Sequence, residues 1–153
     1  MKRFTTLSSL LSVLFALFAL LIVGCTRVAT APGETLLIVS DGTSEKSYAV
    51  ADLEALGAEQ ATFRETVYVG VPLAVLLEDA GFNPANLRAV KARAQDDFSA
   101  NYDPALFNRP DTLVAYARTD GPLAEEDGAF RMVLPDQEGK LNIRFLVELT
   151  AIP

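Results

Sequence analysis

The chain of 153 residues contains no histidine and only one cysteine, Cys25. Disulfides, thiolate zinc sites, histidine metal sites and histidine-based catalytic triads are therefore excluded. General acid–base catalysis would have to rest on carboxylates or on a lysine with a perturbed pKa. Paired carboxylates for glycoside hydrolysis stay open, although so small a domain seldom forms the cleft that this reaction needs. No serine lies in a nucleophile-elbow motif, so we expect no catalytic residue and no metal site.

Basic residues are also fewer than acidic ones. The chain has 13 lysines and arginines against 20 aspartates and glutamates, which gives a net charge of −7. Removing residues 1–24 takes away Lys2 and Arg3 and no acid, so the net charge of the remainder is −9. A surface of this charge repels phosphate backbones and anionic headgroups. We therefore expect no nucleic acid as a partner.

The longest apolar run lies at the N-terminus, where Lys2 and Arg3 precede an apolar stretch over residues 7–23 that only three serines interrupt. This architecture is typical of a secretory signal peptide. The run ends in Ile-Val-Gly-Cys at residues 22–25, which resembles the lipobox of bacterial lipoproteins. We expect a signal peptide over residues 1–24 and lipidation of Cys25. An uncleaved transmembrane anchor stays open, because the run is near the lower limit of roughly 17 to 25 residues for spanning a bilayer.

Residues 25–34 are small and polar and include Pro32-Gly33, which predicts a flexible lipidated tether to one domain over residues 35–153. Two or three acyl chains hold a protein stably at a bilayer. The expected partner of the lipid on Cys25 is therefore the membrane of the cell envelope. Thr26 resembles the residue found in lipoproteins that are sorted to an outer membrane, where the domain would face the periplasm. In a cell with one membrane it would lie on the outer face of the plasma membrane.

The pattern of residues 35–153 favours an α+β domain with a mixed or antiparallel sheet and a few short helices. Helices are indicated by apolar spacing, by proline at a first turn and by glycine at an end. Strands are indicated by β-branched and alternating runs between turns. Strands are expected over 36–39, 47–49, 87–94, 112–117 and 130–134, extended chain over 62–68 and at the C-terminus, helices over 50–56, from 72 to 80 and from 103, and a loop over 96–101.

Three segments carry a family resemblance. Residues 68–81 read YVGVPLAVLLEDAG, residues 127–135 read DGAFRMVLP, and residues 139–145 read GKLNIRF. In this order they resemble the GVPLxxLLxxAG, DGPxRLVxP and GxxxVKW segments of the sulfite-oxidase-like molybdopterin oxidoreductase family. The departures are Ala129 for a usual proline, Arg144 for lysine and Phe145 for tryptophan. The resemblance implies a shortened version of the fold of that family.

The same resemblance implies a ligand site. Arg131 and Arg144 match basic positions near the pterin or its phosphate. Asp97 and Phe98 match the place where the family often has a substrate-facing tyrosine after an Asp-Gly pair, but Phe98 lacks the hydroxyl. The family binds molybdenum through a cysteine thiolate, and no cysteine follows Cys25. We therefore expect no cofactor, with molybdopterin as the alternative, and a site suited to a small anion.

Two functions follow from this resemblance. The first is a non-catalytic binding or accessory lipoprotein with a degenerate molybdopterin-oxidoreductase-like domain, whose partner is a small anionic ligand or an envelope protein. The second is an oxidoreductase that binds a molybdopterin cofactor without a protein thiolate. Arg131 and Arg144 also have a structural alternative, because strand-face charges commonly pair with acids such as Glu138 or Glu148. The acidic run 125–127 is expected to be solvated loop.

The lipid anchor is directly testable. Measurement of the intact mass of the protein extracted from membranes should show the loss of residues 1–24 and the addition of acyl chains. The substitution Cys25→Ala removes the thiol that carries the lipid, so we expect an uncleaved precursor or a protein released from the membrane. Unchanged processing and anchoring of this variant would contradict the lipobox interpretation.

Overall fold

The computed structural model describes residues 34–153. The predicted signal peptide, Cys25 and all of the predicted tether except Glu34 lie outside the described residues. Among residues 34–153, no helix has the length and apolarity that crossing a membrane requires. The strands are β1 Leu37–Ser40, β2 Glu45–Tyr48, β3 Glu59–Phe63, β4 Thr66–Pro72, β5 Ala89–Ala94, β6 Ser99–Tyr102, β7 Leu113–Arg118, β8 Gly121–Pro122, β9 Arg131–Val133 and β10 Leu146–Ile152; the helices are α2 Val50–Leu56, α3 Leu73–Asp79 and α4 Pro104–Phe107, with 3-10 turns η1 Pro84–Asn86, η2 Glu125–Asp127 and η3 Gly139–Leu141.

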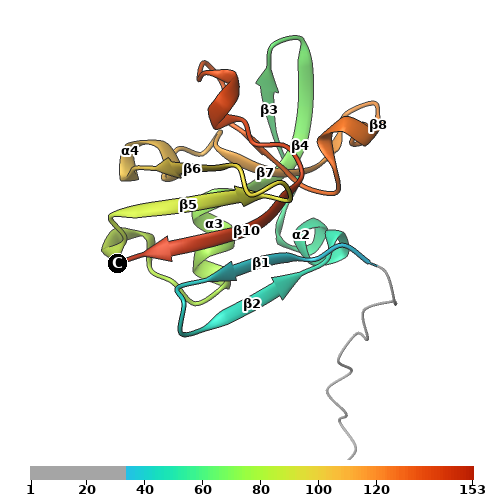
Figure 1. The fold of residues 1–153 in the computed structure, drawn as a ribbon. Helices are drawn as coiled ribbons and strands as arrows, with labels where there is room; N and C mark the ends of the chain where they lie inside the picture. The colour runs from blue at the N-terminus through green and yellow to red at the C-terminus, as the bar shows by residue number, and fades with distance from the viewer. Residues whose placement is uncertain (1–33) are drawn as a thin grey trace, which may run out of the picture. The chain divides into compact units, whose positions relative to one another are not determined.

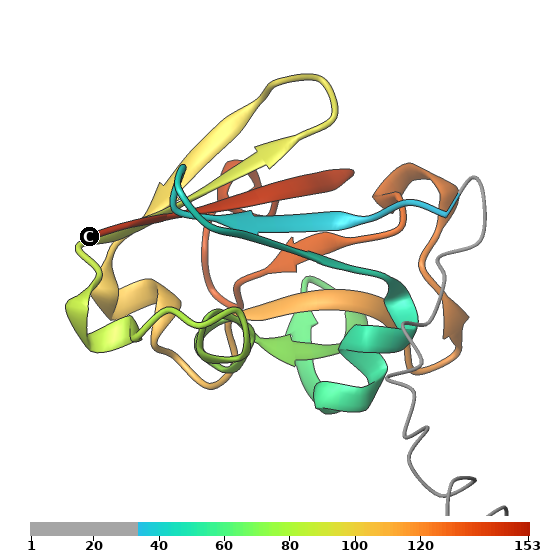
Figure 2. The ribbon, with the colours of Figure 1, turned by 90° about the horizontal axis from the view of Figure 1, so that it is seen from below.

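The strands form two sheets. The first has the order β2-β1-β10-β5-β6, and the second has the order β3-β4-β7-β8, with β9 also paired to β7. Strands β1 and β10 are parallel, and the other pairs are antiparallel. Figure 2 shows the sheets as two layers. The core includes side chains from both sheets and the buried leucines of α3. The predicted α+β class with a mixed sheet is confirmed.

Apolar spacing predicted the two longer helices well. Helix α3 begins directly after Pro72 and buries Leu73, Leu76 and Leu77, which lie at positions i, i+3 and i+4 on one face. Helix α2 covers residues 50–56 as expected, and Gly57 follows it with a φ of +150°. Glycine tolerates this backbone conformation, which L side chains rarely adopt.

Helix α3 is also tied to the edge of the first sheet. The Tyr48 hydroxyl and the Lys46 ammonium both donate to Asp79 Oδ2, at 2.7 and 2.6 Å. The hydrogen bonds from Lys46 and Tyr48 favour the charged carboxylate, so they lower the pKa of Asp79. These bonds connect β2 to the end of α3.

Three local predictions were wrong. Residues 62–68 belong to a hairpin rather than to one extended run, because Arg64 adopts a φ of +56° and turns the chain between β3 and β4. The expected loop over 96–101 includes the start of β6, which pairs with β5. The extended chain expected at the C-terminus begins only with β10, because Arg144 and Phe145 form a bend before it. The segment still runs beside β9, where the N–H of Met132 donates to the carbonyl of Ile143 at 2.7 Å, while β7 pairs with the other edge of β9.

Gly70 permits the closest approach between β4 and β7. A Cβ at this position would lie 2.4 Å from the backbone oxygen of Val114 and 2.7 Å from Cα of Ala115. Backbone atoms cannot move aside cheaply, so we expect Gly70→Ala to lower the free energy of unfolding by about 3 kcal/mol. Chemical denaturation of the wild type, of Gly70→Ala and of a control variant measures this difference in the free energy of unfolding. Gly139→Ala is the control, because its Cβ would meet only Arg64 Nη2 at 3.5 Å. Equal losses in the two variants would contradict the packing argument.

Candidate functional site

The β3–β4 hairpin, η2 and the η3 segment surround a polar cavity of about 450 Å³. In Figure 1 the hairpin projects from the fold beside the η3 loop on one side and η2 on the other. We call this cavity the arginine pocket, because four guanidinium groups line it. Its lining residues are Phe63, Arg64, Thr66, Tyr68, Arg118, Ala124, Glu126, Asp127, Arg131, Gly139, Asn142 and Arg144.

A buried ion pair lies at the wall of this pocket. Arg131 and Asp127 are each about 5% exposed, and Arg131 Nη1 lies 2.5 Å from Asp127 Oδ1. The same nitrogen donates to the Tyr68 hydroxyl at 2.7 Å, and the guanidinium lies 4.4 Å from the centroid of the Tyr68 ring. A buried charge needs such a partner, because water no longer solvates it. The charge of Arg131 is therefore neutralised within the fold.

The other three arginines of the pocket are held less tightly. Arg144 is exposed and makes no ion pair with any residue of the described chain. Arg64 is also exposed, and a Cβ built at Gly139 would lie 3.5 Å from its Nη2. Arg118 Nε is buried and lies 3.2 Å from the mostly exposed Asp120 carboxylate, without the alignment of a hydrogen bond. Arg64 and Arg144 are therefore available to an anion in the pocket, whereas Arg118 is already paired with Asp120.

The local charge of the pocket is opposite to that of the domain. Residues 34–153 contain ten lysines and arginines and twenty acids, so their net charge is −10. Four of the ten cations line this pocket, against only two acids, Glu126 and Asp127. Such a concentration of positive charge in an acidic domain favours binding of an anion.

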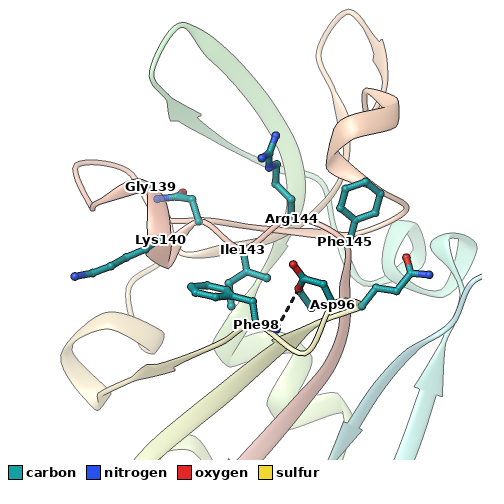
Figure 3. A pocket seen from close by; sticks show the side chains of 10 residues that line it. Asp96, Phe98, Gly139, Lys140, Ile143, Arg144 and Phe145 are labelled. Carbon is teal, nitrogen blue, oxygen red and sulfur yellow. Dashed lines mark hydrogen bonds between the residues drawn. The ribbon is translucent and has the colours of Figure 1, made fainter.

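A second cavity, of about 500 Å³, lies on the other side of the segment 142–145. We call it the aromatic groove, because Phe98 and Phe145 flank it (Figure 3). It shares Gly139, Asn142 and Arg144 with the arginine pocket. The remaining lining residues are Ala94, Gln95, Asp96, Lys140 and Ile143.

The structure brings three of the four predicted ligand residues to these two cavities. Arg131 and Arg144 both line the arginine pocket, and Phe98 and Arg144 both line the aromatic groove. Asp97 lines neither; it lies at the tip of the β5–β6 turn and pairs with Arg93 at 3.1 Å.

Part of the arginine pocket has no signal in the sequence. Neither Arg64 nor Arg118 was predicted, because no local pattern around them signals a ligand site. The acidic run 125–127 was expected to be solvated, and this is wrong for Asp127, which is buried against Arg131.

Comparisons with known proteins identify the fold. Residues 32–153 match the family model described as oxidoreductase molybdopterin binding domain. The sulfane dehydrogenase SoxCD from Paracoccus pantotrophus has a similar structure, with a TM-score of 0.66 and 19% sequence identity. The match covers 77% of this chain and 38% of that chain, so this chain spans well under half of the neighbour's length. A search among curated proteins found no match.

The expectation of no cofactor is therefore wrong, because the matching family is one of molybdopterin-binding domains. The expectation rested on the missing thiolate alone. A thiolate binds the metal, whereas the phosphate of a pterin needs cations and hydrogen-bond donors. The absence of a thiolate therefore does not remove the groups that would bind the phosphate.

The described residues fit the phosphate of such a cofactor, but they offer no thiolate for its metal. The guanidiniums of Arg64 and Arg144, which make no ion pair with any described residue, suit a phosphate, and guanidinium forks bind phosphate with two parallel hydrogen bonds. Residues 34–153 contain no cysteine. That part of the chain also has no group of three or more His, Cys, Asp or Glu side chains placed to hold a metal ion. The pocket thus offers an anion site without a protein thiolate.

The two sequence-predicted arginines should differ sharply in their effect on stability. Arg131→Gln leaves the Asp127 carboxylate buried without its ion partner, so we expect the free energy of unfolding to fall by about 3 to 5 kcal/mol. The exposed Arg144→Gln should change it by less than about 0.5 kcal/mol. Denaturant unfolding measures both values. Similar small effects for the two variants would show that the Arg131–Asp127 pair does not stabilise the fold.

Proposed function

Because the chain belongs to the oxidoreductase molybdopterin binding domain family, we propose that it is a lipid-anchored binding module. In this proposal the arginine pocket holds a phosphate-bearing ligand of the molybdopterin class, and the domain acts as a non-catalytic or accessory component of the cell envelope. The observation that carries the proposal is the concentration of four guanidiniums in one pocket of an acidic domain, two of which, Arg64 and Arg144, are exposed and make no ion pair with any described residue.

The roles of the arginines differ in this proposal. Arg64 and Arg144 are exposed at the pocket and would contact the phosphate directly, and Arg118 would add a third donor group. Arg131 is a positioning residue, because its ion pair with Asp127 fixes the wall of the pocket. Thr66 and Asn142 supply further polar side chains along the lining.

The non-catalytic role rests on the chemistry of the side chains. A molybdenum centre supplies two-electron redox chemistry when it is bound, and the family resemblance implies a cysteine thiolate as its protein ligand. No residue of 34–153 has a thiol, and Cys25 precedes the domain and would carry the lipid. The domain therefore keeps the means to hold an anion and lacks the protein ligand for the metal.

The lipid would confine this binding to a membrane surface. The signal-peptide pattern of residues 1–24 and the lipobox-like residues 22–25 support export and anchoring. A tether of about ten residues would keep the domain close to the membrane. An envelope protein at the same membrane surface is then a suitable partner of the domain with its bound ligand.

Expression in a host that makes the molybdenum cofactor tests the proposal. After oxidation and release, pterin fluorescence should show bound pterin in the purified wild-type protein. Arg64→Gln/Arg144→Gln should reduce the pterin content at least about tenfold, because two charge-assisted contacts are lost. The control is Arg88→Gln/Lys91→Gln, which removes two exposed positive charges outside the pocket and should leave the pterin content unchanged.

Two results would contradict parts of the proposal. Absence of pterin from the wild type, together with no binding of inorganic phosphate, would contradict the binding function. Stoichiometric molybdenum with reduction of an artificial electron acceptor by sulfite would contradict the non-catalytic role and support the oxidoreductase alternative.

A further inference from the structure

One end of the first sheet is the end at which the described chain enters the fold. Strands β1 and β10 are parallel, and Ile38 pairs with Glu148, so both strands begin at the same end of the sheet. Strand β5 is antiparallel to β10 and ends there, because Ala94 pairs with Leu146. In Figure 1, β1 and β10 start at this end and the arrow of β5 points toward it. We call it the tether end and define it as residues 34–36, 95–98 and 143–145.

Exposed apolar side chains are concentrated at the tether end. Within residues 34–153 the large hydrophobic residues with more than a third of their surface exposed are Val75, Phe98 and Phe145, at 39%, 48% and 41%. Phe98 lies in the turn between β5 and β6, and Phe145 lies directly before β10. Neighbouring strands are about 5 Å apart, so both residues lie close to the start of β1. Exposed apolar surface that gathers in one place is typical of a contact with a protein or a membrane.

The backbone holds both rings in place. Phe98 follows Asp97, which has a φ of +67°, and its carbonyl accepts from the N–H of Ala94 at 2.8 Å. Phe145 itself has a φ of +49°, and its N–H donates to the carbonyl of Asp127 at 2.8 Å. Because ordered backbone already presents the rings, a surface that contacts them has little further backbone entropy to overcome.

The charge at the tether end differs from that of the whole domain. The aromatic groove at this end is lined by two cations, Lys140 and Arg144, and by one acid, Asp96. The adjoining arginine pocket is lined by four cations and two acids. Because the net charge of residues 34–153 is −10, the excess of acids lies elsewhere on the domain. Phosphate groups of lipid headgroups are therefore attracted to this end and repelled by the rest of the surface.

The predicted anchor limits the distance between this end and the bilayer. Nine residue steps separate Cys25 from Glu34, and a chain of that length spans at most about 30 Å. A lipid on Cys25 would make any further contact with the same bilayer an intramolecular event. A contact by two rings, too weak to hold a free protein, is then sufficient to orient an anchored one.

We propose that the tether end docks on the bilayer that holds the lipid anchor, with the rings of Phe98 and Phe145 in the interface between headgroups and acyl chains. This proposal rests on the lipid anchor of the proposed function and adds a fixed orientation of the domain. The opposite end of the first sheet, where β10 ends, then faces away from the bilayer.

A single tryptophan can report this contact, because the chain contains none. Phe98→Trp and Phe145→Trp place the reporter at the tether end. Val75→Trp is the matched control, since it places an equally exposed reporter on α3, outside both cavities. Each lipidated mature chain is reconstituted on phosphatidylcholine vesicles with and without bromine on the acyl chains, and tryptophan emission is measured.

We expect bromine to reduce the emission of both tether-end reporters at least about twofold, because interfacial side chains lie about 5 to 10 Å into the headgroup–acyl boundary. The emission of Val75→Trp should not change. In the Phe145→Trp chain, Phe98→Ser should restore part of the emission, because one of the two interfacial side chains is lost. Val75→Ser in the same chain should restore none.

Four results would overturn the docking proposal. Equal quenching of all three reporters, or quenching of none, would overturn it and leave the lipid anchor standing. Failure of the wild type to stay with the vesicles would contradict the anchor, and the docking proposal with it. If the tether-end emission instead shifts to shorter wavelength as protein density rises, without quenching by bromine, the rings contact a second protein chain. Pterin content tests the arginine pocket separately.

Discussion

The buried Arg131–Asp127 pair is the interaction on which the geometry of both cavities depends. It joins β9 to η2, and the Tyr68 hydroxyl joins the same guanidinium to β4. The carbonyl of Asp127 also accepts from the N–H of Phe145, so the pair is coupled to the segment that separates the two cavities. A buried charge that loses its partner is strongly unfavourable. The pair therefore fixes η2, β4 and the start of β10 relative to one another.

The arginines of the pocket thus have two different roles, one inside the fold and one at its surface. Arg131 satisfies an internal carboxylate, whereas Arg64 and Arg144 are exposed on a hairpin turn and a bend. Phosphate is attracted by the exposed groups, and the buried pair preserves the shape of the pocket that they line. Phe145 adds an apolar wall on the far side of Arg144. Arg144 thus lies between a polar cavity lined by guanidiniums and a more apolar groove.

Much of the fold could be predicted from local sequence, whereas the pairing within the site could not. Helix α3 follows from Pro72 and the spacing of three leucines. The family-like motifs predicted Arg131 and Arg144 as ligand residues, and both line the arginine pocket. The turn at Arg64 has no such signal, because a left-handed arginine is set by the surrounding structure. Asp127 belongs to an acidic run that predicts a solvated loop. Its contact with Arg131 depends on where the fold places β9. The expectation of no cofactor is wrong because the loss of one metal ligand does not remove the groups that contact the rest of a cofactor.

A crystal structure of the mature chain purified from a cofactor-making host tests the central claim most directly. The account predicts a phosphate group within hydrogen-bond distance of Arg64 or Arg144, with no protein sulfur at the ligand and with the Arg131–Asp127 pair intact. A ligand bound elsewhere, or a phosphate held by Arg131 after separation from Asp127, would contradict it.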